Sequence, residues 1–260
     1  MTQPWHGRFC WYELMTTDPA AAEGFYAKVV GWGTRPFPGG GTPYTLWTNG
    51  EQAVGGLMEL PEEARAGGAP PNWLPYVAVE DADATTAQAQ AIGGKVEVGP
   101  REIPGEGRFA VLSDPQGAVF AILQPSDPRA GRPDEHPAPR EISWRELATT
   151  DREGAMAFYA ALFGWQRQNA NDMGEPVGIY QEFGRPGMPL GGIYRKPADM
   201  PFPPHWLTYA KVPDIEASVA AVKAGGGQVL NGPMEIPGGD RIAQCLDPQG
   251  AAFALHQAKG

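Results

Sequence analysis

Two glutamates, Glu13 and Glu146, occur in a sequence context that suggests a binding or catalytic role. Each follows a tryptophan by two positions, in the segments WYELMTTD and WRELATTD, which read as strands leading into helices. Residues two apart in a strand share a face, so each glutamate lies beside an aromatic ring. A carboxylate on an inward-looking face must be solvated, hydrogen-bonded or paired. Such a group can accept a hydrogen bond from a ligand amine or serve as a general acid or base.

A structural role for the two glutamates stays open beside the functional one. Hydrogen bonds to neighbouring backbone, or an ion pair with Arg108 or Arg241, would satisfy either carboxylate equally well, because many perturbed carboxylates are structural. These arginines end two copies of a Glu-Ile-Pro-Gly-x-x-Arg segment that reads as a hairpin. They can pair there with Glu102 and Glu235, the first residues of the same segments.

Aromatic residues accumulate on the same predicted strands and form a candidate ligand-binding surface. A face lined with Trp and Tyr suits a flat organic ligand, since ring stacking provides affinity and a few polar groups provide orientation. For any single ring, a place in the hydrophobic core is the alternative. The candidates are Trp11, Trp47, Trp73, Tyr76, Trp144, Tyr180, Trp206 and Tyr209.

Other reactive residue types form no recognisable motif. The sequence lacks a phosphate-binding loop, a dinucleotide fingerprint and a nucleophile elbow. Cys10 and Cys245 occupy non-equivalent places, which favours two free buried thiols over a disulfide. None of the histidines recurs at an equivalent place, which favours surface or loop positions. The four are His6, His136, His205 and His256.

The elements that must position these residues occur twice, at an offset of 133 residues. Residues 10–32 and 143–165 agree at 12 of 23 positions, and residues 93–121 recur as 226–254. Each copy begins with a strand, an aspartate that can cap a helix, and a helix whose Phe-Tyr pair forms its buried side. Further strands follow, then a second helix after another aspartate, and strands joined by an Asp-Pro-Gln-Gly turn. Each half therefore reads as two strand-helix-strands modules.

The bulk composition is that of a folded protein with two domains. We expect a first domain at residues 1–125, an extended linker at 126–140 containing four prolines, and a second domain at 141–260. A net charge of −10, from 30 acidic and 20 basic residues, opposes binding to nucleic acid or an anionic membrane. No leader or apolar run of about 18 residues is present. The expectation is a cytoplasmic monomer with an internal pseudo-dimer.

These paired signatures resemble the glyoxalase, bleomycin-resistance and extradiol-dioxygenase superfamily, also called vicinal oxygen chelate proteins. The resemblance rests on the strand ending at Asp18 or Asp151, the Phe-Tyr and Gly-Trp of the following helix, and the Asp-Pro-Gln-Gly turn. It implies an α+β fold of two tandem domains, each made of paired βαβββ modules. Their mixed sheets would curl into cups with the helices outside and the site inside. Fold membership by itself does not define a reaction.

The resemblance also implies four inward-facing positions that hold metal ligands, usually His, Gln or Glu, in the metal-dependent relatives. Here none of those positions carries a side chain that can bind a metal. We therefore expect no metal and no cofactor in either half. In the first half the positions fall at Trp11, Gly56, Leu74 and Ala121, and in the second at Trp144, Gly192, Leu207 and Ala254.

Three functions are compatible with these features. The first is metal-free binding of a small aromatic or hydrophobic molecule in the cups, as the resemblance to bleomycin-resistance proteins implies. The second is a metal-independent glyoxalase- or hydroxylase-like enzyme that uses Glu13 or Glu146 as acid or base. In the third, each cup is filled by its own side chains and the protein acts through its surface.

Overall fold

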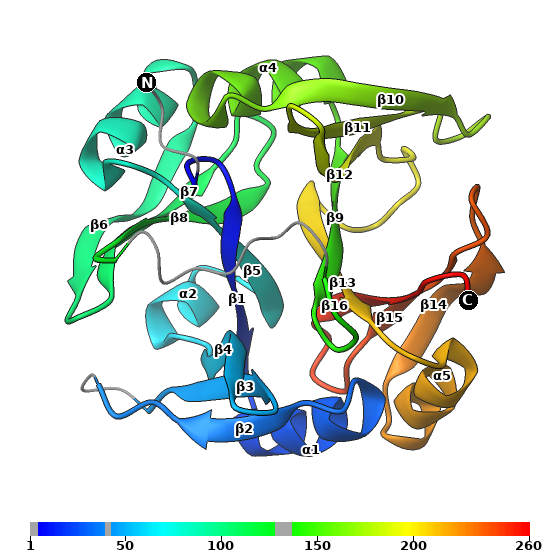
Figure 1. The fold of residues 1–260 in the computed structure, drawn as a ribbon. Helices are drawn as coiled ribbons and strands as arrows, with labels where there is room; N and C mark the ends of the chain where they lie inside the picture. The colour runs from blue at the N-terminus through cyan, green and yellow to red at the C-terminus, as the bar shows by residue number, and fades with distance from the viewer. Residues whose placement is uncertain (1–4, 40–42, 128–136) are drawn as a thin grey trace. The chain divides into compact units, whose positions relative to one another are not determined.

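The chain folds into two eight-stranded mixed sheets flanked by five helices among the residues that the structure, a computed structural model, describes (5–39, 43–127 and 137–260; Figure 1). The predicted α+β class and the two sheets are confirmed. Most of the predicted linker, with His136, lies outside the described residues, so the expected domain boundaries stay a prediction.

The first half contributes one sheet with the strand order β2-β3-β4-β1-β5-β8-β7-β6. The connector before β5, which the sequence did not predict to be regular, contains the short helix α2. The elements are β1 (Phe9–Thr16), α1 (Pro19–Val29), β2 (Gly33–Pro36), β3 (Thr45–Asn49), β4 (Gln52–Glu59), α2 (Glu62–Ala66), β5 (Asn72–Ala78), α3 (Ala82–Ala91), β6 (Lys95–Ile103), β7 (Gly107–Ser113) and β8 (Val119–Pro125).

The second half repeats this arrangement with the order β10-β11-β12-β9-β13-β16-β15-β14. Its elements are β9 (Ile142–Thr149), α4 (Arg152–Phe163), β10 (Gln166–Asp172), β11 (Ile179–Arg185), β12 (Met188–Arg195), β13 (His205–Lys211), α5 (Ile215–Ala224), β14 (Gln228–Glu235), β15 (Arg241–Leu246) and β16 (Ala252–Gln257).

The helix starts follow the chemistry that the sequence predicts. The Asp18 carboxylate accepts the backbone N–H of Ala21 at 3.0 Å, and Asp151 accepts that of Gly154 at 3.0 Å. Each bond satisfies an N–H group that the first helical turn leaves without a partner. Helix α4 ends at Gly164, whose φ of +69° suits a residue without a Cβ atom.

Modules from different halves pack together into two compact units. One unit holds α1 and β2–β4 of the first half with α5 and β14–β16 of the second, and in it α1 lies against α5 (Figure 1). The other holds α3 and β6–β8 with α4 and β10–β12, and in it α3 lies against α4. The boundaries between the units fall within β1, β5, β9 and β13. The halves are therefore repeats in sequence, but each compact unit is assembled from both.

A buried polar chain in each unit links the two repeated motifs. The Trp73 indole N–H donates to the Tyr26 hydroxyl at 2.9 Å, and that hydroxyl donates to the Asp247 carboxylate at 3.1 Å. Tyr26 comes from the Phe-Tyr pair of the first half, whereas Asp247 opens the Asp-Pro-Gln-Gly turn of the second. Buried polar groups need such partners. The tyrosine of the Phe-Tyr pair in one half is thus hydrogen-bonded to the aspartate of the Asp-Pro-Gln-Gly turn in the other half.

The same chain recurs in the other unit with the halves exchanged. Trp206 donates to the Tyr159 hydroxyl at 3.1 Å, and Tyr159 donates to Asp114 at 3.1 Å. Burial, followed by the charge of Asp114, raises the pKa of Tyr159 well above its ordinary value, so the phenol stays a proton donor.

Candidate functional site

In the first half, Glu13 is held by a tyrosine that the sequence analysis did not single out. The Tyr44 hydroxyl donates to Glu13 Oε2 at 2.8 Å and accepts the indole N–H of Trp11 at 2.9 Å. Glu13 is 7% exposed, whereas Trp11 and Tyr44 are half-buried. Trp11, Tyr44 and Glu13 form one polar cluster with aromatic surface open to solvent, which we call the Tyr44–Glu13 cluster.

A glycine in β4 makes room for this cluster. Gly56 is the register partner of Glu13 in the parallel β1–β4 pair, and a Cβ atom at Gly56 would overlap the Tyr44 hydroxyl. Any larger residue would therefore displace the phenol from the carboxylate. Because Gly56 has no side chain, Tyr44 can lie across the strand.

The second half repeats the phenol–carboxylate contact, with a different third residue beside it. The Tyr180 hydroxyl donates to Glu146 Oε1 at 2.9 Å, and Glu146 pairs in register with Gly192, where a Cβ atom would overlap the Tyr180 ring. Tyr194 stacks on Tyr180 with ring centroids 6.2 Å apart. Glu146, Tyr180 and Tyr194 form the Tyr180–Glu146 cluster, and its recurrence shows that the arrangement does not depend on the loops that differ between halves.

The Tyr44 phenol acts as the donor to the Glu13 carboxyl because its proton is tightly held. Burial, followed by the negative charge of Glu13, raises the pKa of Tyr44 far above its ordinary value. Burial, followed by the charge of Glu146, likewise raises the pKa of Tyr194. Each site therefore presents a neutral phenol beside a carboxyl group, which can bind a polar group of a ligand or pass a proton to it.

The candidate arginine partners of the two glutamates make ion pairs elsewhere. Arg108 bonds to Asp83 at 2.7 Å and to Glu102 at 3.2 Å, the second being the hairpin pair considered from the sequence. Arg241 bonds to Glu216 of α5 at 2.6 Å. These arginines therefore tie the hairpins to α3 in the first half and to α5 in the second.

The predicted aromatic residues divide between the two faces of the sheets. Trp47 and Trp73 pack with Tyr26 of α1 at centroid distances of 5.5 and 5.4 Å, and Trp206 packs with Tyr159 of α4 at 5.3 Å. These three indoles are buried on the helix side, which favours the core role left open by the sequence.

The other predicted rings lie on the opposite face from those indoles. Strand alternation places Tyr76 with Leu74, away from Trp73. Tyr209 belongs to a buried cluster with Leu207 and Ala254, against which Trp144 packs. Trp11 and Tyr180 belong to the two phenol–carboxylate clusters.

The residues at the four ligand positions of each half do not fit a metal ion. Tryptophan offers only an N–H donor, and glycine, leucine and alanine have no donor atom for a metal. In the first half the Trp11 N–H is already directed to the Tyr44 hydroxyl, which lies across Gly56. Within the described part of the chain, no group of three or more His, Cys, Asp or Glu side chains is arranged to hold a metal.

Tyr194 and Tyr44 are the cluster residues that sequence reasoning missed, and of these two Tyr44 was marked by a recurring pattern. Its signal was the Gly-Gly pair that recurs at residues 55–56 and 191–192, each copy preceded by a strand that carries a tyrosine. Spacing could not reveal the contact, because the loop between β2 and β3 differs in length from the loop between β10 and β11.

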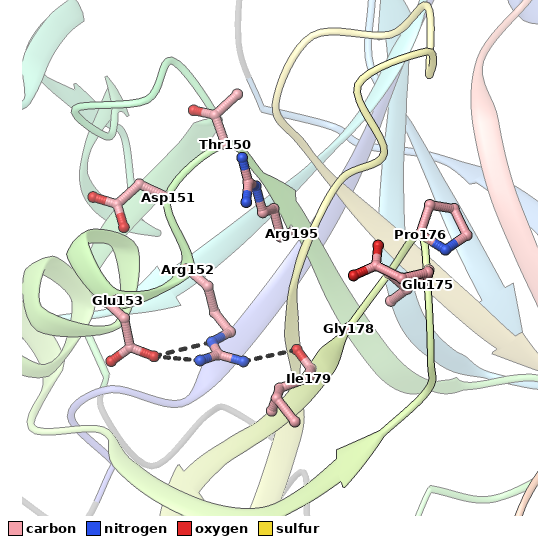
Figure 2. A pocket seen from close by; sticks show the side chains of 10 residues that line it. Thr150, Asp151, Arg152, Glu153, Glu175, Pro176, Gly178, Ile179 and Arg195 are labelled. Atoms are coloured by element: carbon pink, nitrogen blue, oxygen red, sulfur yellow. Dashed lines mark hydrogen bonds and ion pairs between the residues drawn. The ribbon is translucent and has the colours of Figure 1, made fainter.

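A separate surface pocket of about 310 Å³ lies at the start of α4 (Figure 2). Arg152, Glu153 and Arg195 line it together with the loop at residues 175–178. Arg152 bonds there to Glu153 at 3.0 Å and to the Ile179 carbonyl at 2.9 Å, so its charge is engaged. The lining is mixed in charge, and it contains neither of the predicted glutamates.

Comparison with known proteins agrees with this architecture. The family model described as "Glyoxalase/Bleomycin resistance protein/Dioxygenase superfamily" matches residues 8–122 and again 141–255. "Putative glyoxylase CFP32" of Mycobacterium tuberculosis is 35% identical over 251 residues, covering 94% of this chain and 92% of that protein. "Anthracycline biosynthesis protein DauV" of Streptomyces sp. strain C5 is 31% identical, covering 98% of this chain and 94% of its own length.

Solved structures show the same fold at low identity. A Mn(II)-bound glyoxalase from Novosphingobium aromaticivorans superimposes with a TM-score of 0.62 at 18% identity, covering 99% of this chain and 83% of that one. A variant of homoprotocatechuate 2,3-dioxygenase from B. fuscum gives 0.66 at 15% identity, covering 100% and 73%. With two family matches that span both halves, the chain belongs to the glyoxalase/bleomycin resistance protein/dioxygenase superfamily.

Proposed function

We propose that the chain binds a small aromatic or hydrophobic molecule on the sheet faces that carry the Tyr44–Glu13 and Tyr180–Glu146 clusters. The observation that carries the proposal is the repeated phenol–carboxylate pair beside partly exposed rings. Aromatic surface supplies stacking, and the carboxyl and phenol groups supply the few polar contacts that orient a ligand. The proposed contact residues are Trp11, Tyr44, Glu13, Tyr180 and Glu146.

The names of two relatives favour a polycyclic aromatic ligand. DauV and the similar "Anthracycline biosynthesis protein DnrV" of Streptomyces peucetius are named for the biosynthesis of compounds that contain fused, flat rings. Hydroxyl groups at the edge of such a ring system could donate to a glutamate while the ring stacks on an indole or phenol. We propose that this chain takes a ligand of that class, without a metal or other cofactor and as a monomer.

A titration with a hydroxylated anthraquinone, followed by tryptophan fluorescence and calorimetry, tests the binding proposal. We expect Glu13→Gln and Glu146→Gln to weaken binding roughly tenfold each, because a hydrogen bond to a charged group contributes about 1.5–3 kcal/mol. Glu63→Gln, which changes an exposed carboxylate of helix α2, is the matched control. Wild-type binding that neither cluster variant alters would remove the glutamates from the proposal.

A metal-independent glyoxalase- or hydroxylase-like enzyme is the second candidate. It is supported by the buried carboxyl of Glu13, which accepts a hydrogen bond from the Tyr44 hydroxyl at 2.8 Å, and by the name of CFP32. In this reading the glutamate removes a substrate proton as general base. Turnover of a methylglyoxal–thiol adduct or a catechol in the presence of a chelator, lost in Glu13→Gln or Glu146→Gln, would favour the enzyme over the binding protein.

A further inference from the structure

A serine, a histidine and an aspartate lie in hydrogen-bond contact in the second half, on strands far apart in sequence. Ser143 Oγ is 2.8 Å from His256 Nδ1, and His256 Nε2 is 2.9 Å from Asp240 Oδ2. Ser143 comes from β9, His256 from β16, and Asp240 directly precedes β15. The sequence favours a loop or surface position for His256, but the structure places it in β16, at the centre of this constellation.

The hydrogen bonds determine which nitrogen of the neutral imidazole carries the proton. A carboxylate can only accept, so His256 Nε2 donates to Asp240 and Nδ1 is left with a lone pair. The Ser143 hydroxyl then donates to Nδ1 in preference to the Tyr209 carbonyl, which lies farther away at 3.3 Å. This is the protonation pattern in which a histidine can accept the proton of a nucleophilic serine.

The aspartate is held in its charged form. A hydrogen bond from the Lys259 backbone N–H, followed by the contact with His256 and the charge of Lys211, keeps the pKa of Asp240 below its ordinary value. Its side chain is 37% exposed, and that of His256 is 16% exposed. Ser143 is also only half-buried, so a small substrate can reach the hydroxyl.

Apolar side chains adjoin the constellation on the same sheet. Ile242 is the register partner of His256 between β15 and β16. Ile242 and Trp144 both pack against the buried cluster of Leu207, Tyr209 and Ala254. A hydrophobic or aromatic acyl group would find a matching surface there.

The first half provides an internal contrast. At the offset of 133 residues, Ser143 corresponds to Cys10, His256 to Leu123 and Asp240 to Gly107. The first half therefore lacks both the imidazole and the carboxylate at these positions. The constellation belongs to the second half by sequence, whereas the phenol–carboxylate clusters occur in both.

We propose that Ser143 is a nucleophile that attacks activated apolar esters or thioesters, with His256 as its base and Asp240 as a positioning residue. The Ser143 oxygen bonds to the acyl carbon while its proton passes to His256 Nδ1. The bond to the alcohol or thiol then breaks, and that group leaves with the proton from His256. Water attacks the acyl-serine with His256 again as base, which releases a carboxylic acid and restores the hydroxyl. A good leaving group lowers the demand for stabilisation of charge on the acyl oxygen.

Labelling of the full chain with a fluorophosphonate, located by peptide mass spectrometry, tests this proposal. The reagent forms a phosphonyl-serine and releases fluoride, with the serine proton taken up by the base. We expect Ser143 to be labelled in the native protein and no longer labelled after urea unfolding. His256→Leu, which installs the first half's residue, and His256→Gln should each slow labelling about 100-fold, the usual scale of a general base.

Controls separate a reactive serine from an accessible one. Ser126→Ala, at an exposed serine bonded to the Gly105 carbonyl, should leave the labelling rate unchanged. Asp240→Ala should slow it, and Asp240→Glu should restore it, which loss of packing alone would not produce. Absence of label on Ser143 in the native chain overturns the proposal. The proposal is also overturned if both folded His256 variants are labelled at the same rate as the native protein. The same holds if Ser143 is labelled in the unfolded chain at the native rate.

Discussion

Replacing Tyr26 by phenylalanine should destabilise the protein more at neutral than at acidic pH. The change removes the donor to Asp247 and the acceptor of the Trp73 N–H, and all three residues are buried. A hydrogen bond to a charged group contributes about 1.5–3 kcal/mol, and an unsatisfied buried donor costs about 1–3 kcal/mol. Because the two bonds share one hydroxyl, their losses need not add. We expect a loss of about 2–4 kcal/mol at neutral pH.

The pH dependence of this loss of stability follows from the ionisation of Asp247. Burial raises the pKa of Asp247 in the folded protein, and the hydrogen bonds from the Ala251 backbone and from Tyr26 oppose that rise. A carboxyl whose pKa is higher in the folded than in the unfolded state costs stability as the pH rises from its unfolded value, about 3.9, through its folded value. Without the Tyr26 hydroxyl the folded pKa rises further, so the cost at neutral pH grows. Toward pH 4 a larger fraction of the carboxyl is protonated, so the loss is smaller.

Urea unfolding at pH 4 and pH 7.5, monitored by tryptophan fluorescence, measures this difference. At pH 7.5 the loss corresponds to a melting temperature roughly 4–16 °C lower, at about 2–4 °C per kcal/mol for a chain of this size. Tyr159→Phe should show the same pH-dependent loss of stability, because Tyr159 donates to Asp114. Tyr26→Phe combined with Asp247→Asn should show a loss that does not depend on pH. A loss below about 0.5 kcal/mol, or an equal loss at both pH values, would refute the reasoning; a buried side-chain deletion of any kind normally costs about 1 kcal/mol.

Four further outcomes are expected. Gly56→Ala should displace Tyr44 from Glu13 and weaken anthraquinone binding by at least as much as Glu13→Gln; unchanged affinity would separate the cluster from the ligand. Elemental analysis of the purified protein should find no stoichiometric transition metal, and chelator treatment should leave ligand affinity unchanged. Burial raises the pKa of the Cys245 thiol to about 12, so at pH 8 it should react with a disulfide reagent at least about 100-fold more slowly than in unfolded chain, whose thiol pKa is about 8.5. Light scattering should give the mass of one chain, 27.8 kDa, and a dimer mass would contradict the monomer proposal.

Local patterns were sufficient to predict the elements that carry the site. The aspartate caps, the Phe-Tyr helices and the Asp-Pro-Gln-Gly turns are all short-range features, and each forms as the sequence predicts. The helix α2 was missed because its connector is rich in Gly, Ala and Pro and it buries no side chain. Glu13 and Glu146 were identified because strand periodicity alone assigns a residue to a face.

The sequence contains no apolar run of about 18 residues, and the helices of the structure can be compared with that observation. Across the residues described, no helix combines the length and the apolar character that a crossing of the bilayer requires.

By itself, the sequence determined that the chain is a duplicated α+β protein of the glyoxalase/bleomycin resistance protein/dioxygenase superfamily whose ligand positions carry no metal-binding side chains. The duplication and the order of strands and helices rest on repeats, periodicity and residue chemistry, whereas the superfamily and the ligand positions were implied by the resemblance of the repeated motifs. The tertiary structure decided which side chains meet. Tyr26 contacts Asp247, which is 221 residues away in the sequence, and His256 contacts Ser143, which is 113 residues away. Tyr44 contacts Glu13, 31 residues away, from a loop whose length differs between the two halves. Such contacts depend on strand order and packing between modules, and no local pattern encodes them.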